Sequence, residues 1–172
     1  MKKLILMTVG ILIFTLSYGQ ENFKWEKTDS IAKTKFQIYS DTKIFIAETW
    51  KSAKNVIQYD DKENGAIFIE GNIKKIAGNA NRIADYWYSY NVKFYMKEQK
   101  YRIVIENVEF KHCSNGGGWI AQVANEYPGA WHCSLLEKQW TELMTSLKMD
   151  MQNIIDDYEK YIKISSVTND NW

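Results

Sequence analysis

Proline is nearly absent from this chain, which has Pro128 as its only proline among 172 residues. Without proline-rich or serine-rich stretches, nothing in the sequence marks a linker, and this length suits one ordinary domain.

The sequence also lacks an excess of charge of either sign, because 22 basic residues stand against 21 acidic ones and the formal net charge is +1. A chain this balanced has no long-range field to gather nucleic acid or an anionic membrane surface. The sequence therefore argues against a nucleic-acid partner.

Long apolar runs are equally scarce, and the one that is present lies at the amino terminus. Two lysines precede an apolar run over residues 4–16, and the small residues Ser17 and Gly19 follow it at the spacing that a signal peptidase accepts. The run is shorter than the roughly 20 residues that span a bilayer. The pattern therefore predicts a signal peptide over residues 1–19 and one exported domain over residues 20–172. We expect that domain to be periplasmic or extracellular, with no stable membrane anchor after the signal is cleaved.

Cysteine and histidine occur only twice each, and all four residues lie in one segment. Two His-Cys-Ser triplets begin at His112 and His132 and enclose a glycine-rich stretch. Because exported proteins with an even number of cysteines usually oxidise them, we expect a disulfide between Cys113 and Cys133. The alternative is a tetrahedral zinc site formed by both histidines and both cysteines, although adjacent ligands lack the usual spacing of about two to four residues. A cysteine nucleophile is disfavoured, because an oxidised thiol cannot attack a substrate.

Alternating apolar and polar residues, which indicate β-strands, fill the middle of the sequence. The pair Asn64-Gly65 separates apolar runs at residues 56–59 and 66–69. Both residues of this pair tolerate the positive φ of a tight turn, and the segment therefore predicts a hairpin.

Two longer strands are predicted further on, at residues 86–96 and 101–110, on either side of a turn at residues 97–99. Their apolar residues recur at every second position until Asn107, after which Val108 begins the opposite parity. A phase slip of this kind predicts a β-bulge.

Helices are predicted on both sides of these strands. Residues 35–50 favour a helix that begins after Thr34, although the pattern also fits two short strands. The expected buried face of that helix carries Phe36, Tyr39, Ile46 and Trp50, with Phe45 beside them. The carboxyl-terminal region is helical, because its apolar residues advance by steps of three and four: Leu136, Trp140, Leu143, Leu147, Met151, Ile154, Tyr158 and Ile162. The element order predicts an α+β fold, an antiparallel sheet of about four to five strands with both helices on one face.

The residues from Trp50 to Gly71 resemble a family of secreted bacterial domains. A helix that ends in tryptophan is followed by Val-Ile-Gln, then by Asp-Lys-Glu-x-Gly-x-Ile and by long alternating strands. These motifs are similar to domain-of-unknown-function family 4468 of Bacteroidota, whose secreted proteins also resemble this chain in having glutamine after the signal. The resemblance covers about residues 36–110 and implies a fold like that of the TATA-binding protein, with residues 35–50 helical. It implies no known activity, cofactor or catalytic residue, and a shared fold does not imply DNA binding.

One face of the predicted sheet is a candidate binding surface. If the helices cover the face that carries Tyr86, Tyr88 and Tyr90, the opposite face carries polar residues together with Phe68, Trp87, Tyr95 and Val104. We expect a nearby loop to add further aromatic residues, namely Trp119, Tyr127 and Trp131. Such a face could bind a sugar, a peptide or a partner protein. The alternative is an ordinary solvated face with a few exposed apolar residues.

The absence of any complete catalytic set favours a binding protein over an enzyme. We therefore expect an exported, non-catalytic binding or envelope-interaction module without a cofactor. Its partner is a ligand or an envelope protein that cannot be identified from the sequence. Two alternatives stay open. One is a zinc-dependent hydrolase that uses His112, Cys113, His132 and Cys133, and the other is a structural subunit whose aromatic face is an oligomer contact.

Overall fold

The computed structural model describes residues 23–50, 53–79, 82–113, 122–123 and 136–165. Its elements along the chain are β1 (Trp25–Ser30), α2 (Lys35–Thr49), α3 (Ala53–Val56), β2 (Ile57–Asp61), β3 (Ala66–Asn79), β4 (Arg82–Lys97), β5 (Lys100–Cys113), β6 (Gln122–Val123) and α5 (Glu137–Ile164). The predicted order of a helix, several antiparallel strands and a long helix is confirmed, while β1 and β6 are additional.

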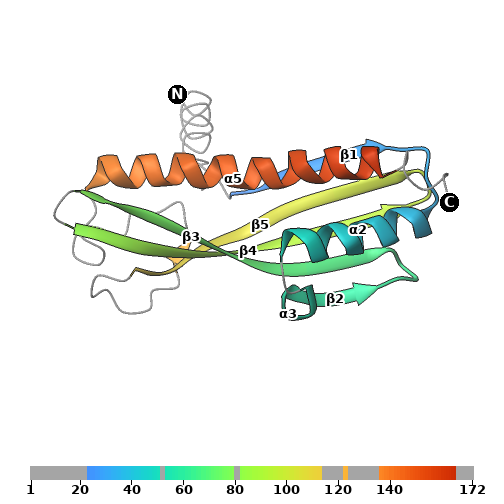
Figure 1. Ribbon diagram of the computed structural model, residues 1–172, viewed down its shortest axis with the longest axis horizontal. Helices are drawn as coiled ribbons and strands as arrows, with labels where there is room; N and C mark the ends of the chain where they lie inside the picture. Colours follow the sequence, from blue (N-terminus) through green and yellow to red (C-terminus); the bar gives the residue numbers. More distant parts are fainter. Residues whose placement is uncertain (1–22, 51–52, 80–81, 114–121, 124–135, 166–172) are drawn as a thin grey trace, which may run out of the picture.

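The strands form one antiparallel sheet in the order β1-β5-β4-β3-β2, and β6 pairs with β5 beyond the end of β1. The ladder between β3 and β4 is unbroken, from Ala66 opposite Tyr95 to Asn79 opposite Arg82. In contrast, β2 covers only the first part of β3, up to Ile69. The central strands β3, β4 and β5 are long and twisted, and the outer strands β1 and β2 are short (Figure 1).

Both long helices cover the same face of this sheet, as the sequence predicted. Figure 1 shows α5 running along nearly the whole sheet, with α2 over the half that contains the turns at residues 62–65 and 98–99. Aromatic rings join the layers: the ring centroid of Tyr158 on α5 lies 5.1 Å from that of Phe45 on α2 and 4.9 Å from that of Phe94 on β4. This covered face, with the buried side chains of Tyr86 and Tyr88, forms the core.

A capping box explains where α2 begins. The Thr34 hydroxyl accepts a hydrogen bond from the Gln37 N–H at 3.2 Å, and the Gln37 side-chain oxygen accepts one from the Thr34 N–H at 2.9 Å. The predicted helix is confirmed, but Phe36 is 55% exposed and does not lie on its buried face, which includes Ile38 and Phe45. Because apolar residues lie on both sides of α2, its sequence pattern also fitted two strands.

The apolar stripe of α5 differs from the prediction at two positions. Leu136 is 63% exposed, because it precedes the first turn as the N-cap. Ile155 is buried in place of Ile154, since the stripe continues four residues beyond Met151. The other predicted members are buried: Trp140, Leu143, Leu147, Met151, Tyr158 and Ile162.

A bulge in β5 lies where the apolar alternation changes parity. The pairing of β4 with β5 shifts between Ser89 and Asn91. Asn107 occupies the extra position on β5, with a φ of 54°. As a result, Ile105 and Val108 on either side of it are both buried. The predicted bulge is confirmed.

Candidate functional site: the open face of the sheet

We call the sheet face opposite α2 and α5 the open face, because no described helix lies over it. Tyr59 on β2, Phe68 on β3 and Tyr95 on β4 place their rings side by side on this face. The ring centroids are 4.9 Å apart between Tyr59 and Phe68 and 5.5 Å apart between Phe68 and Tyr95. These separations are contact distances for aromatic pairs. We refer to the three residues as the aromatic row.

Two cations lie over the aromatic row. The Lys93 Nζ is 5.5 Å from the centroid of the Phe68 ring, and the guanidinium carbon of Arg102 is 5.8 Å from the centroid of the Tyr95 ring. Both separations are within the roughly 6 Å range of cation–π attraction. The cations therefore cover part of the ring surface that would otherwise face solvent.

Each of these cations is also paired with a carboxylate. Lys93 Nζ lies 2.5 Å from Glu106 Oε1, and Arg102 Nε lies 2.8 Å from Glu26 Oε1. The hydrogen bond to Glu106 raises the pKa of Lys93, and the hydrogen bond from Arg102 lowers the pKa of Glu26. Both shifts favour the charged forms, so the open face carries fixed charges that largely cancel one another.

The turn between β2 and β3 positions Tyr59. Its hydroxyl donates a hydrogen bond to Asp61 Oδ2 at 2.8 Å, and the Asn64 N–H donates one to Asp61 Oδ1 at 2.9 Å. The backbone hydrogen bond from Asn64, followed by those from the Asn64 and Tyr59 side chains, lowers the pKa of Asp61 to about 2. The carboxylate thus links the hairpin turn to the first ring of the row.

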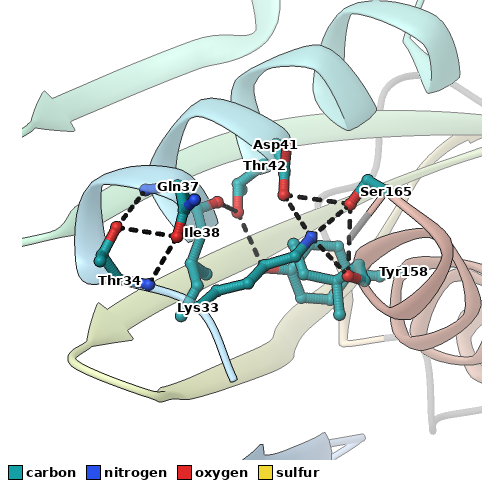
Figure 2. Close-up of polar contacts among 9 residues, drawn as sticks. Lys33, Thr34, Gln37, Ile38, Asp41, Thr42, Tyr158 and Ser165 are labelled. Carbon is teal, nitrogen blue, oxygen red and sulfur yellow. Dashed lines mark hydrogen bonds and ion pairs between the residues drawn. The ribbon is translucent and has the colours of Figure 1, made fainter. Parts of the chain in front are cut away.

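A buried polar cluster between α2 and α5 is the other candidate site. Lys33 Nζ lies 2.5 Å from Asp41 Oδ2, 2.6 Å from Ser165 Oγ and 2.8 Å from the carbonyl oxygen of Ile162 (Figure 2). A lysine can activate a serine only as a neutral amine that accepts the hydroxyl proton. In this cluster three acceptors match the three N–H groups of a charged ammonium. Ser165 also donates to Asp41 at 3.0 Å, so the geometry suits a structural clamp better than a nucleophile.

The chain matches the model of one known protein family. The family described as a domain of unknown function (DUF4468) with a TBP-like fold matches residues 25–111, just over half of the sequence. The chain belongs to the DUF4468 family.

Two crystal structures resemble this DUF4468 chain. A TBP-like protein from Parabacteroides distasonis has a TM-score of 0.64 at 11% identity, over 82% of this chain and 92% of that one. A DUF4468 family protein from Bacteroides ovatus has a TM-score of 0.59 at 17% identity, over 80% of this chain and 85% of that one. None of the curated proteins compared with the chain matches it. At these identities the likeness shows the shared fold alone.

The open face of this DUF4468 chain brings together part of the predicted binding set. Phe68 and Tyr95 lie in the aromatic row. Val104 shares the open face but is only 3% exposed, so its side chain has little surface to offer a ligand. Trp87 is 40% exposed, but it stands eight residues along β4 from Tyr95, a separation of roughly 27 Å in a strand. The predicted face is therefore one aromatic row with a distant tryptophan.

Several predicted residues lie outside the described part of the chain: Trp119, Tyr127, Trp131, His132, Cys133 and the signal peptide. The backbone of His112 and Cys113 ends β5, but their side chains are likewise outside it. The disulfide and the zinc site therefore stay predictions. Within the described residues, no group of three or more His, Cys, Asp or Glu side chains could hold a metal ion. None of the described helices has the length and hydropathy needed to cross a membrane.

Tyr59 is the member of the aromatic row that the sequence analysis left out, and its side chain is 44% exposed. The hairpin signal at Asn64-Gly65 could have found it. Tyr59 lies directly opposite Phe68 in the ladder, and directly opposite residues place their side chains on the same face.

Proposed function

We propose that this chain is an exported, non-catalytic binding module whose partner is a protein that docks on the open face over the aromatic row. The observation that carries this proposal is the row itself, three contacting rings on the sheet face that no described helix covers. Tyr59 is exposed and the other two rings are half-buried, so the row presents grouped aromatic surface, which marks interaction surfaces more often than single apolar side chains do. Tyrosine and arginine, which meet at one end of the row, are also enriched at the energetic centres of protein interfaces.

The cations over the rings favour a protein partner over a sugar. A sugar stacks its C–H groups on an open aromatic face, whereas Lys93 lies over Phe68 and Arg102 lies over Tyr95. A protein surface can contact the ring edges and the paired charges at the same time, because interfaces combine an aromatic centre with polar groups around it.

The ion pairs also disfavour nucleic acid. Lys93 and Arg102 are each paired with a carboxylate, and the chain has a formal net charge of +1. Binding to phosphates is driven by cations that release counterions, and cations already neutralised by the protein contribute little to it. A TBP-like fold alone does not supply DNA binding, because function belongs to the site.

Alanine substitutions test this proposal. The Tyr59→Ala/Tyr95→Ala variant removes two rings of the row. Phe36→Ala is the matched control, because Phe36 is a 55% exposed ring on α2 with Lys62 Nζ 4.4 Å from its centroid. The tagged wild-type chain is first purified from the cells that produce it, together with the protein that binds it. The affinity of this partner protein for the wild type and for each variant is then measured.

We expect the double variant to keep its circular dichroism spectrum and to bind about 30-fold more weakly, the effect of a hot spot worth about 2 kcal/mol. The Phe36→Ala control should bind like the wild type. Equal affinities for all three proteins would contradict the proposal. A Trp87→Ala variant then reports how far the contact extends along β4.

A further inference from the structure

One edge of the sheet is left unpaired along most of β3. β3 runs from Ala66 to Asn79, whereas its outer neighbour β2 pairs with it only as far as Ile69. No other described strand pairs with that edge of β3. An open edge of this length is a template for an additional strand unless the protein covers or blunts it.

The ladder identifies which backbone groups the edge offers. The Gly65 carbonyl oxygen accepts from the Met96 N–H at 2.7 Å, and the pairing of β3 with β4 continues without a shift. Because N–H and C=O groups alternate between the two sides of a strand, the groups that point away from β4 belong to Asn72, Lys74 and Ile76. No described group forms a hydrogen bond with them. The edge therefore presents regularly spaced donors and acceptors.

A groove accompanies this edge. It has a volume of about 290 Å³ and is lined by Ile76 and Ala77 of β3 and by Gln139, Glu142 and Leu143 of α5. Lys75 fixes its width, since its ammonium donates to Ser146 Oγ of α5 at 2.8 Å and pairs with Asp150. Figure 1 shows the amino-terminal half of α5 beside this end of β3. A strand edge flanked by a helix gives an incoming peptide both hydrogen bonds and a side-chain pocket.

We propose that the free edge of β3 binds an extended segment of another protein as an additional strand, with one side chain in the groove beside α5. The row of backbone donors and acceptors selects this occupant, because an extended polypeptide backbone has the matching spacing. This inference does not rest on the aromatic row, which lies at the other end of β3.

A second copy of the chain fits this edge less well than a foreign segment. In a symmetric dimer, the free stretches of two β3 strands, residues 70–79, would pair with each other in antiparallel fashion. If the two-fold axis passed through the middle of this stretch, Lys74 or Lys75 would lie opposite the same residue of the second copy. Like charges directly opposite one another destabilise a ladder, and the pairing of Lys74 with Asp85 and of Lys75 with Asp150 reduces this repulsion without removing it. The 66% exposed Ile76 instead offers apolar surface to one incoming strand.

Hydrogen exchange and peptide selection test the proposal together. A phage-displayed library of random twelve-residue peptides is selected on the wild-type chain, and the exchange of single amides is followed by NMR with and without the selected peptide.

Proline variants test whether the backbone of the edge binds the peptide. Lys74→Pro removes an N–H that β4 does not use, which a strand edge tolerates. Lys74→Ala is its matched control, because it removes the same side chain and keeps the N–H. Asn72→Pro and Asn72→Ala form a second pair if Lys74→Pro fails to fold.

The amides of Asn72, Lys74 and Ile76 should exchange rapidly in the free monomer and become protected by the peptide. Lys74→Pro should weaken peptide binding by about tenfold or more, whereas Lys74→Ala should bind like the wild type. Three results would overturn the proposal. The amides could be protected in the free monomer, they could be protected only as light scattering detects a dimer, or the proline variant could bind the selected peptides as well as its alanine control.

Discussion

The side-chain ammonium of Lys33 lies 2.5 Å from a carboxylate oxygen of Asp41, and the two side chains are only 5% and 8% exposed. This buried pair connects the start of α2 to the carboxyl end of α5, because Lys33 also donates to the Ile162 carbonyl oxygen at 2.8 Å. A cation at that position also interacts favourably with the helix dipole. The pair therefore holds the two helices together on one face of the sheet.

Removing one member of this pair should destabilise the fold strongly. We expect Lys33→Ala to lower the free energy of unfolding by about 3–5 kcal/mol, because it leaves the Asp41 carboxylate buried without its partner. The Lys33→Met/Asp41→Leu variant should recover most of that loss, since it removes both charges. Urea unfolding measures each difference.

Lys43 and Asp60 provide the surface control for this experiment. Lys43 Nζ also lies 2.5 Å from Asp60 Oδ2, but the two side chains are 37% and 33% exposed. Lys43→Ala should therefore cost no more than about 1 kcal/mol. Similar losses for Lys33→Ala and Lys43→Ala would show that burial does not set the strength of the first pair.

Acid should weaken the hairpin turn that positions Tyr59. Hydrogen bonds in the folded protein lower the pKa of Asp61 to about 2, below its unfolded value of about 3.9. Its ionised form therefore stabilises the fold above about pH 4, and this contribution disappears as the pH falls towards about 2. Asp61→Asn should be less stable than the wild type at pH 7, and the difference should narrow across this window. A difference that stays constant from pH 7 to pH 2 would contradict this role for Asp61.

Two buried hydroxyls predict opposite effects of the same substitution. Among the described residues, the Tyr88 hydroxyl is buried without a hydrogen-bond partner, whereas the Tyr158 hydroxyl lies 2.8 Å from Thr42 Oγ1. We expect Tyr88→Phe to raise the free energy of unfolding by about 1 kcal/mol, because it removes an unsatisfied polar group. Tyr158→Phe should lower that free energy by about 1 kcal/mol, because it breaks a buried hydrogen bond. Chemical denaturation of both variants checks the two signs, and a loss of stability in Tyr88→Phe would mean that its hydroxyl has a partner such as water.

Local patterns predicted most of β4 and β5, because burial of one sheet face repeats at every second residue. The slip at Asn107 was visible for the same reason. β1 was missed, since Trp25 is the only large apolar residue in Trp25–Ser30 and the strand is held by its pairing with β5. The far half of β3 was missed too, because Lys74, Lys75 and two glycines hide its alternation. Residues 70–79 form a strand because they pair with residues 82–91 of β4.

The candidate site could be predicted only where pairing follows from a short turn. Counting across one hairpin brings Tyr59 opposite Phe68. The low exposure of Val104 could not be predicted, because it depends on how side chains from several strands lie together. The contact of Lys33 with Ser165 joins residues 132 positions apart, and no local pattern in one sequence encodes such a pairing.

The most direct test of the open face as a protein-docking surface is site-specific photo-crosslinking in the cells that produce the chain. A photoreactive phenylalanine analogue is placed at Tyr59 in the aromatic row, and in a second protein at Phe36, the exposed ring on α2. Docking over the aromatic row predicts that irradiation yields a discrete protein adduct from position 59 and none from position 36. Adducts of the same size and yield from both positions, or from neither, would contradict it.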